Sequence, residues 1–197
     1  LATNHATGTA EEVIAAADSL GYPLAVKLLN ADLAHKNHAG AVHLDIKDAA
    51  GVEQAISAIQ ASVSRYDASL DTGHFLIERM VVAPRSEFIA GVSYKPGIGH
   101  ALVIGRGGID VEELKDFTTL LLPASVAQID EAVRGLSLAR KLRLDQRDIP
   151  AVVKAVSQIV EFTTQYRDRL VELDVNPIIL DAAGNCTAVD ALVRMRS

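Results

Sequence analysis

Several residue types are scarce in this sequence of 197 residues, and each shortage narrows the class of protein. It has one cysteine, Cys186, so the chain has no internal disulfide, which suits a reducing compartment such as the cytoplasm. We expect Cys186 to be a small core residue and not a nucleophile. Tryptophan is absent and aromatics make up only 4%, which argues against stacking platforms for nucleic-acid bases.

Long uniform runs are missing as well. No apolar run is long enough to span a membrane and no signal peptide is visible, so we expect no membrane partner. The basic residues form no long run and the formal net charge is −6, which argues against a nucleic-acid partner. The first residue is not methionine, so we expect a piece of a longer protein. The hydrophobic content of 49% suffices for one large domain or two small lobes.

Mixed helix and strand signals predict an α+β or α/β fold. Capping-box patterns at Thr9 with Glu12 and at Ser125 with Gln128 open two helices, the second running to about Leu142. Asp48 opens a long helix, and Pro150 suits the first turn of a further one. The remaining expectations are a turn-like start at 1–8, strands at 23–29, 41–46, 74–82, 86–94, 100–104 and before Pro123, and a polar link at 67–73 between lobes 1–73 and 74–197.

Residues 171–176 alternate strictly between apolar and oxygen-bearing side chains, which predicts a half-buried strand. Alone, the polar row of Glu172, Asp174 and Asn176 is typical of a solvated strand face. A short Asp/Gly/Asn loop follows, and a hairpin centred on Ala183 would place Asn176 opposite Asp190. Carboxylate and amide oxygens are ligands that Mg²⁺ prefers, so the paired strands favour a metal site.

Three further stretches carry chemistry with two interpretations each. Lys27 in an apolar strand is either an edge-strand gatekeeper or a cation directed at an anion. The loop 32–40, with His35, Lys36 and Gly40, is either a phosphate-binding loop or an exposed polar turn. Glu78 to Val81 with Glu87 is either a backbone site for a purine edge or an ordinary strand pair.

In their order along the chain, these stretches resemble the ATP-grasp domain of NDP-forming acyl-CoA synthetases, relatives of the succinyl-CoA synthetase β subunit. The likeness covers nearly the whole chain, and it implies that the family's first helix and strand are missing ahead of Leu1. The matching stretches are 21–27, 32–36 with Gly40, 78–81 with Glu87, 107–108 with 112–116, and 172–177 with Asp190.

The resemblance implies an ATP-grasp fold of two lobes with the nucleotide, ATP or ADP, between them. It also implies a role for each matching residue. The phosphates would contact Lys27 and Gly40, and adenine would bind to the backbone of Glu78, Arg79, Met80 and Val81. The ribose would bind to Glu87, and Mg²⁺ would be held by Asn176 and Asp190, with Asp174 as an extra contact. His35, next to Lys36, would be the catalytic phosphohistidine.

The implied reaction joins a carboxylic acid to CoA with conversion of ATP to ADP and phosphate. The resemblance implies CoA-binding and ligase domains in the same chain or another subunit, and an oligomer. Three departures favour an alternative, a non-catalytic regulatory or assembly module of a multidomain acyltransferase: Ala39 replaces a family glycine, Leu120 a family arginine, and 139–148 lacks the family's Gly-Arg-Gly. A carboxylate–amine ligase is a third reading, which would need no phosphohistidine.

Overall fold

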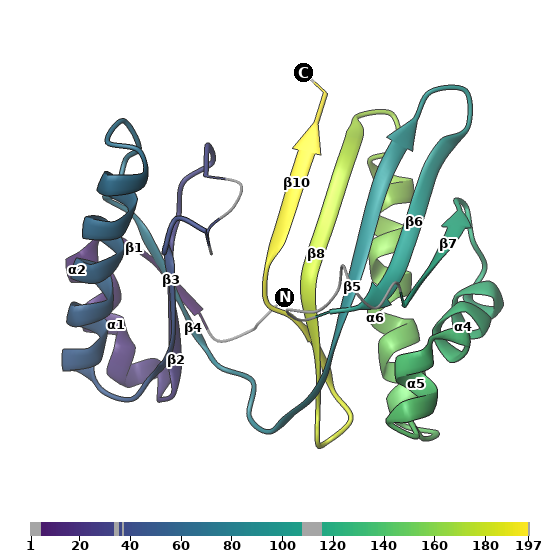
Figure 1. Ribbon diagram of the computed structural model, residues 1–197, viewed down its shortest axis with the longest axis horizontal. Helices are drawn as coiled ribbons and strands as arrows, with labels where there is room; N and C mark the ends of the chain where they lie inside the picture. Colours follow the sequence, from purple (N-terminus) through teal and green to yellow (C-terminus); the bar gives the residue numbers. More distant parts are fainter. Residues whose placement is uncertain (1–4, 34–35, 37, 108–115, 197) are drawn as a thin grey trace. The chain divides into compact units, whose positions relative to one another are not determined.

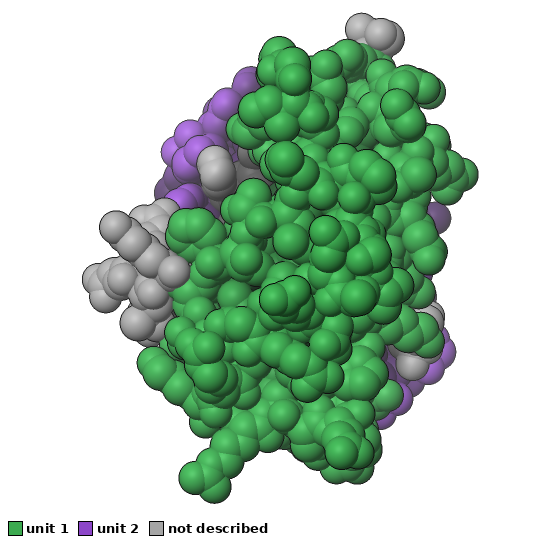
Figure 2. Space-filling model, turned by 90° about the vertical axis from the view of Figure 1, so that its right-hand side faces the viewer, with its two compact units in different colours: residues 1, 81–197 green, residues 2–80 purple. Residues whose placement is uncertain are grey.

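Two antiparallel sheets organise the chain in the computed structural model, which describes residues 5–33, 36, 38–107 and 116–196 (Figure 1). The chain divides into two compact units, which Figure 2 colours separately. The first unit spans residues 2–80, and the second spans 81–197 together with residue 1. No helix among the described residues is long and apolar enough to cross a membrane.

The first unit is a four-stranded sheet covered on one face by two helices (Figure 1). Leu24, Val26 and Leu28 project from one strand into a core that receives Val13 and Ile59 from the helices. The strand order is β1-β4-β2-β3. The elements are β1 (His5–Gly8), α1 (Ala10–Leu20), β2 (Leu24–Leu28), β3 (Val42–Ile46), α2 (Ala49–Tyr66) and β4 (Phe75–Arg79).

The caps predicted for these helices are confirmed. Thr9 and Glu12 form a reciprocal capping box at α1, with the Thr9 backbone N–H donating to Glu12 Oε2 at 2.7 Å. Asp48 Oδ1 accepts from the Gly51 N–H at 2.7 Å at the start of α2. These side chains satisfy N–H groups that have no partner inside the first turn, so both helices begin where the sequence indicates.

Three expectations about the first unit differ from the structure. Residues 5–8 form a strand and not a turn, because their backbone pairs with β4. The segment 67–73 does not link two lobes, since it connects α2 to β4 inside one unit. The units meet at 80/81 and not at 73/74, because β4 lies between β1 and β2 and shares their hydrogen-bond ladders.

The second unit is a six-stranded sheet whose helices cover one face (Figure 1). Its core combines Phe88, Leu102 and Val175 from the strands with Ile129 and Val156 from the helices. The strand order is β10-β8-β5-β6-β7, and β9 pairs with β8. The elements are β5 (Pro84–Lys95), β6 (Gly99–Arg106), β7 (Phe117–Leu121), α4 (Val126–Gly135), α5 (Ser137–Lys141), α6 (Asp148–Gln165), β8 (Leu170–Asp181), β9 (Cys186–Ala188) and β10 (Ala191–Met195).

The helix predicted from Ser125 to Leu142 is divided in two at Leu136, which has an extended backbone. The reason is a side chain far away in sequence. Both carboxylate oxygens of Asp116 accept backbone N–H groups, from Ser137 and from Leu138, at 2.7 Å each. Asp116 thereby caps α5, whose own N-cap residue supplies no side-chain bond.

Candidate functional site

Lys27 lies on an interior strand, because β2 has β4 on one side and β3 on the other. The edge-strand gatekeeper interpretation is therefore wrong. Lys27 Nζ forms an ion pair with Glu78 Oε2 at 2.5 Å, and both residues are buried, with 6% and 8% of their surfaces exposed. The two charges neutralise each other in a buried position where water does not solvate them.

The register of β2 and β4 explains how these side chains meet. Ala25 lies opposite Glu78 and Lys27 lies opposite Leu76, so Lys27 and Glu78 are diagonal neighbours on one face of the sheet. Val26 and Ile77 point to the other face, into the core beneath the helices. The ion pair therefore occupies the face of the first sheet that α1 and α2 do not cover.

The His-Lys loop is described in part, and His35 lies outside the described residues. The Lys36 carbonyl accepts from the Ala41 N–H at 2.8 Å, which closes the turn that returns the chain to β3. Gly40 has φ +64°, and a Cβ there would lie 2.5 Å from Ser62 Oγ on α2. Packing therefore already requires glycine at this position. Ala39, one of the family departures, is buried with 2% exposed.

The segment from Glu78 to Val81 joins the two units. The Met80 N–H donates to the Pro23 carbonyl at 3.0 Å, which extends the β2–β4 ladder by one bond. Because backbone groups alternate in direction along a strand, the N–H and C=O of Arg79 point away from β2. The Glu78 carboxylate is paired with Lys27, so a ligand at this segment would meet backbone groups more readily than the acidic side chain.

An acidic cluster lies on the second sheet, on the face that its helices do not cover. We call Glu172, Asp174 and Asp190 the acid cluster. Leu173 and Val175 are buried in the core, so the residues that alternate with them point to the opposite face. Burial, followed by the charges of Glu172 and Asp190, raises the pKa of the half-buried Asp174 carboxyl above its ordinary value. Proximity to like charges makes ionised Asp174 unfavourable.

Two features keep the neighbourhood of Asp174 open and acidic. Gly91 lies directly opposite on β5, and a Cβ there would be 3.5 Å from Asp174 Oδ1, an ordinary contact. A larger side chain at Gly91 would stand beside that carboxylate. Arg194 pairs with Glu172 at 3.4 Å and is itself mostly exposed.

The hairpin register predicted from the sequence agrees with the structure. Ile178 lies opposite Ala188, and the Asn176 N–H donates to the Asp190 carbonyl at 3.2 Å, so Asn176 and Asp190 are cross-strand neighbours. A register shift at Phe88/Ala90 of the adjacent strand marks a β-bulge beside Asn176. Bulges of this kind redirect side chains at functional sites.

The donor set of two carboxylates and one amide, all oxygen, fits a hard cation such as Mg²⁺. Among residues 5–33, 36, 38–107 and 116–196, no group of three or more His, Cys, Asp or Glu side chains has the arrangement of a metal site. A metal at this hairpin would therefore take Asn176 as one of its protein ligands and complete its shell with ligand or water oxygens.

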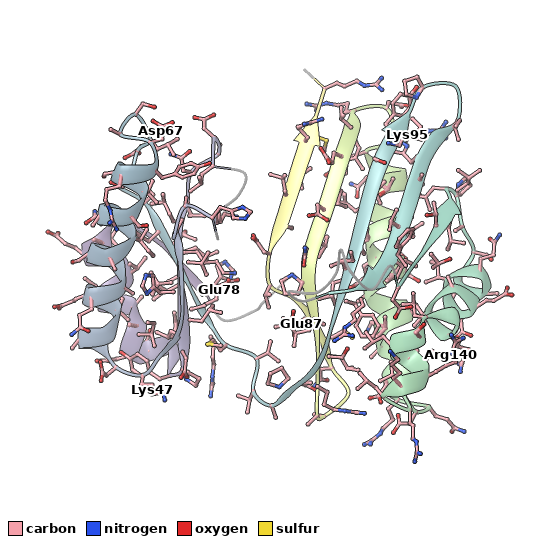
Figure 3. All side chains as sticks on the ribbon, in the orientation of Figure 1. Lys47, Asp67, Glu78, Glu87, Lys95 and Arg140 are labelled. Atoms are coloured by element: carbon pink, nitrogen blue, oxygen red, sulfur yellow. The ribbon has the colours of Figure 1, made fainter. Side chains whose placement is uncertain are left out.

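Glu87 is half-buried on β5 of the second unit, and Figure 3 labels it. Its neighbours Ser86 and Phe88 point into the unit, so Glu87 lies on the same uncovered face as the acid cluster. The Glu87 carbonyl accepts from the Gly107 N–H at 2.8 Å. A Cβ on Gly107 would lie 3.0 Å from Glu87 Cβ, so this glycine of the Gly-Gly pair is needed for close strand packing.

Sequence reasoning missed a buried ion pair in the second unit. Asp148 is 1% exposed, and both its oxygens accept from Arg85 Nη1 at 3.0 Å. The pair ties the beginning of β5 to α6, and no local pattern signals it because the partners are 63 positions apart. Cys186 is half-buried, and burial raises the pKa of its thiol to about 12, which agrees with a packing role.

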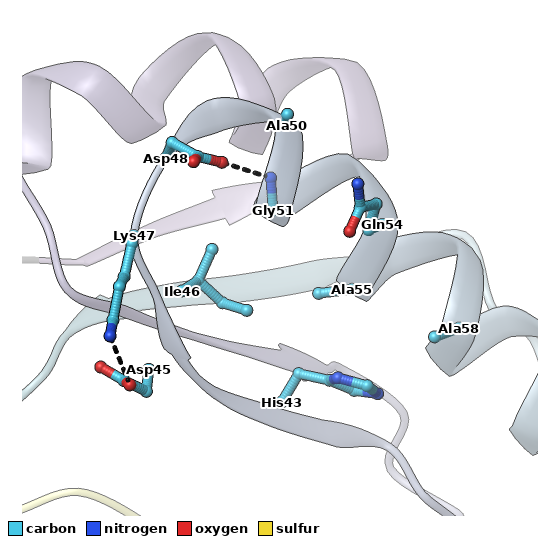
Figure 4. A pocket seen from close by; sticks show the side chains of 10 residues that line it. All are labelled: His43, Asp45, Ile46, Lys47, Asp48, Ala50, Gly51, Gln54, Ala55 and Ala58. Carbon is cyan, nitrogen blue, oxygen red and sulfur yellow. Dashed lines mark hydrogen bonds and ion pairs between the residues drawn. The ribbon is translucent and has the colours of Figure 1, made fainter.

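A hollow of about 690 Å³ lies between β3 and α2 of the first unit (Figure 4). In its lining, Lys47 pairs with Asp45 at 3.2 Å and Asp48 caps α2. The lining includes none of the catalytic, nucleotide-binding or metal-binding candidates of the sequence analysis. The acid cluster and the Lys27–Glu78 pair remain the candidate functional groups.

Residues 1–195 match the family model described as an ATP-grasp domain. The chain is 29% identical over 193 residues to the β subunit of ADP-forming acetate–CoA ligase II of Pyrococcus furiosus, covering 95% of this chain and 81% of that subunit. It is 28% identical over 186 residues to the ADP-forming 4-hydroxybutyrate–CoA ligase of Nitrosopumilus maritimus, covering 92% of this chain but only 26% of that longer protein. The crystal structure of PH1788 from Pyrococcus horikoshii matches with a TM-score of 0.89 and 26% identity, over 99% of this chain and 84% of that one.

Proposed function

Because the chain belongs to the ATP-grasp domain family, we propose that it is the ATP-binding domain of an ADP-forming acyl-CoA synthetase. The named relatives are ADP-forming CoA ligases, and the chain covers most of a β subunit but only a quarter of a longer ligase. The activation of an acid and its transfer to CoA would then need CoA-binding and ligase domains beyond this chain.

The observation that carries the proposal is the geometry of the β8 hairpin, in which Asn176 and Asp190 are cross-strand neighbours beside Asp174, whose pKa is raised. Half-buried carboxylates that repel one another need a cation to be stable when ionised. We assign that cation to Mg²⁺ held by Asn176 and Asp190, with Asp174 as an additional contact. When bound, Mg²⁺ neutralises charge on the phosphates of ATP and so favours transfer of the terminal phosphoryl group.

In the first unit, Lys27 supplies the cation that meets phosphate, and the Glu78 pair holds its side chain in place. The backbone of Arg79 and Val81 presents alternate N–H and C=O groups to the adenine edge, because the Met80 N–H is bonded to Pro23. Glu87 on the second unit would accept hydrogen bonds from the ribose hydroxyls. Lys27, Arg79 and Glu87 lie on strands with defined register.

For the chemical step, we assign His35 as the nucleophile. A neutral ring nitrogen forms a bond to the terminal phosphorus as the bond from phosphorus to the bridging oxygen breaks, and ADP leaves with that oxygen. Lys36 beside it offsets negative charge on the transferred group. The phosphohistidine would then pass its phosphoryl group to the acid at a site supplied by other domains.

Calorimetry with Mg-ATP tests the binding part of the proposal. The wild type should bind, Asp190→Ala should lose at least tenfold in affinity, and the control Asp168→Ala, which removes a 92% exposed carboxylate elsewhere, should bind like the wild type. Equal affinity in all three proteins would refute the metal assignment.

Phosphorus NMR after incubation with Mg-ATP tests the chemical part of the proposal. The phosphohistidine signal should vanish in His35→Ala and should remain in the control His38→Ala.

A non-catalytic module is the second candidate, and the structure bears on the departures that favour it. Leu120 lies opposite Leu102 and packs against the core, so it points to the helix-covered face and not toward the acid cluster. Ala39 is likewise buried in the core of the first unit. Both departures therefore serve packing, and a wild type that binds no Mg-ATP would be the result that favours the module.

A further inference from the structure

Among the described residues, the two sheets have five edge strands, and four of them are short or interrupted. β9 has only three residues and pairs only with β8. β1 has only four residues and ends at Gly8. β3 contains Asp45, which has φ +59° and pairs with Lys47, and the register shifts along its partner strand. β10 carries Arg194, with a register shift beside it. Charges, bulges and short length are the devices by which edge strands avoid pairing with other chains.

The fifth edge strand, β7, has no charge and no bulge. Its sequence Phe117-Thr-Thr-Leu-Leu121 contains no charged residue, glycine or proline, and it pairs with β6 in unbroken register over all five positions. The residues are β-branched, aromatic or aliphatic, which suits them to a sheet. An uncharged, regular edge is a template for another strand.

The backbone direction of β7 shows which groups the edge presents. The Arg106 N–H donates to the Asp116 carbonyl at 3.0 Å, and the Leu122 N–H donates to the His100 carbonyl at 2.9 Å. Even-numbered residues therefore bond to β6, and the alternation of an antiparallel ladder turns the N–H and C=O of Phe117, Thr119 and Leu121 outward. The backbone groups of these odd-numbered residues are therefore the ones to which an added strand would hydrogen-bond.

Side chains on both faces of β7 extend this surface. Phe117 and Leu121 are 59% and 63% exposed on the face away from the helices. On the helix face, a groove of about 520 Å³ lies between β7 and α4. Its lining includes Thr118 and Leu120 on the strand, Ala132 and Gly135 on the helix, and the acidic residues Asp116 and Glu131. An added strand would place its own side chains over the apolar pair and into this groove.

We propose that the occupant of this edge is β7 of a second copy of the chain, related by a twofold axis that passes beside Thr119. Antiparallel pairing centred there sets Thr119 opposite the same residue of the copy, Phe117 opposite Leu121, and Thr118 opposite Leu120. Every pair is uncharged, and each apolar side chain on the exposed face meets another. A segment that is complementary to itself in this way suits a twofold dimer.

Two features favour a second copy over a foreign strand. The five residues of β7 have no charge with which to select an oppositely charged partner, whereas their own sequence supplies the matching register. The groove beside α4 accepts a Leu or Thr side chain, which are the residues that β7 directs to that face. The interface lies on one unit alone and is independent of the proposed nucleotide function.

Sedimentation equilibrium of the chain tests the proposal over about 1–100 µM protein, the range expected for an interface of small area. The wild type should approach twice the monomer mass. Thr119→Lys places like charges opposite each other and should remain monomeric, while the control Ile98→Lys, which removes a 65% exposed apolar side chain in the β5–β6 turn, should still dimerise. A wild type that stays monomeric at the highest concentration overturns the proposal, as does a dimer unaffected by Thr119→Lys.

Cysteine cross-linking keeps the test valid if Thr119→Lys fails to fold. In a Cys186→Ala background, Thr119→Cys should form a covalent dimer on mild oxidation, because directly opposed residues of this pair type have Cα atoms about 5.5 Å apart. Thr118→Cys should cross-link at least tenfold more slowly, since its partner across the strand is residue 120. Equal rates for the two variants would contradict the register and the proposal with it.

Discussion

The two units bury charge in opposite ways. In the first, Lys27 and Glu78 are almost fully buried and neutralise each other at 2.5 Å. In the second, the pKa of Asp174 is raised first by burial and then by the charges of Glu172 and Asp190. The Lys27–Glu78 pair is neutral without a ligand, whereas a bound cation would lower the repulsion on Asp174. Under the proposed function, only the second arrangement would take up a cation with the nucleotide.

The largest effect should come from breaking the paired charges. Lys27→Met leaves the Glu78 carboxylate buried without its cation, and we expect a loss of about 3–5 kcal/mol in the free energy of unfolding, measured with urea. Adding Glu78→Leu should recover most of that loss, because the uncompensated charge is gone. If the double variant is as unstable as Lys27→Met, the pair does not hold the first unit together in the way described.

The sequence predicted what depends on neighbours along the chain. The capping boxes, the Asp48 cap and the hairpin centred on Ala183 follow from local residue types, and the structure reproduces them. It missed what depends on strand order. Nothing local indicates that β4 joins the first sheet, and without that pairing the contact of Lys27 with Glu78 is invisible. The roles of Asp116 and Asp148 could not be predicted either, because their partners lie far away in sequence.

An intermediate effect should come from Gly40, which distinguishes packing from phosphate binding in the first unit. Gly40→Ala combines a positive φ with a Cβ 2.5 Å from Ser62 Oγ, so we expect a loss of about 2 kcal/mol or more in unfolding free energy. Gly97→Ala is the matched control, since Gly97 also has a positive φ but nothing within 4 Å. It should cost about 1 kcal/mol. Equal losses would remove the packing explanation.

The smallest effect concerns Asp174 in the acid cluster of the second unit. Asp174→Asn removes a repelled carboxylate, so in the absence of Mg²⁺ we expect it to stabilise the chain by about 0.5 kcal/mol at neutral pH, a value reduced for solvent screening. Because the folded pKa of Asp174 is raised, the folded state binds more protons than the unfolded state between the ordinary value of 3.8 and the raised one. The wild type should therefore lose part of its stability as the pH rises through that window, and Asp174→Asn should not. Thermal unfolding across the window, with Asp168→Asn as control, makes the comparison.

The central claim is that the acid cluster awaits a cation, and the pKa of Asp174 tests it most directly. Carbon-13 NMR of the side-chain carboxyl, titrated with and without Mg-ATP, reports that pKa without relying on turnover. We predict a value above the ordinary one in the chain alone and a fall to or below it when Mg-ATP is present, with no such fall in Asp190→Ala. An ordinary pKa in the chain alone, or a raised pKa that Mg-ATP leaves unchanged, would contradict the account.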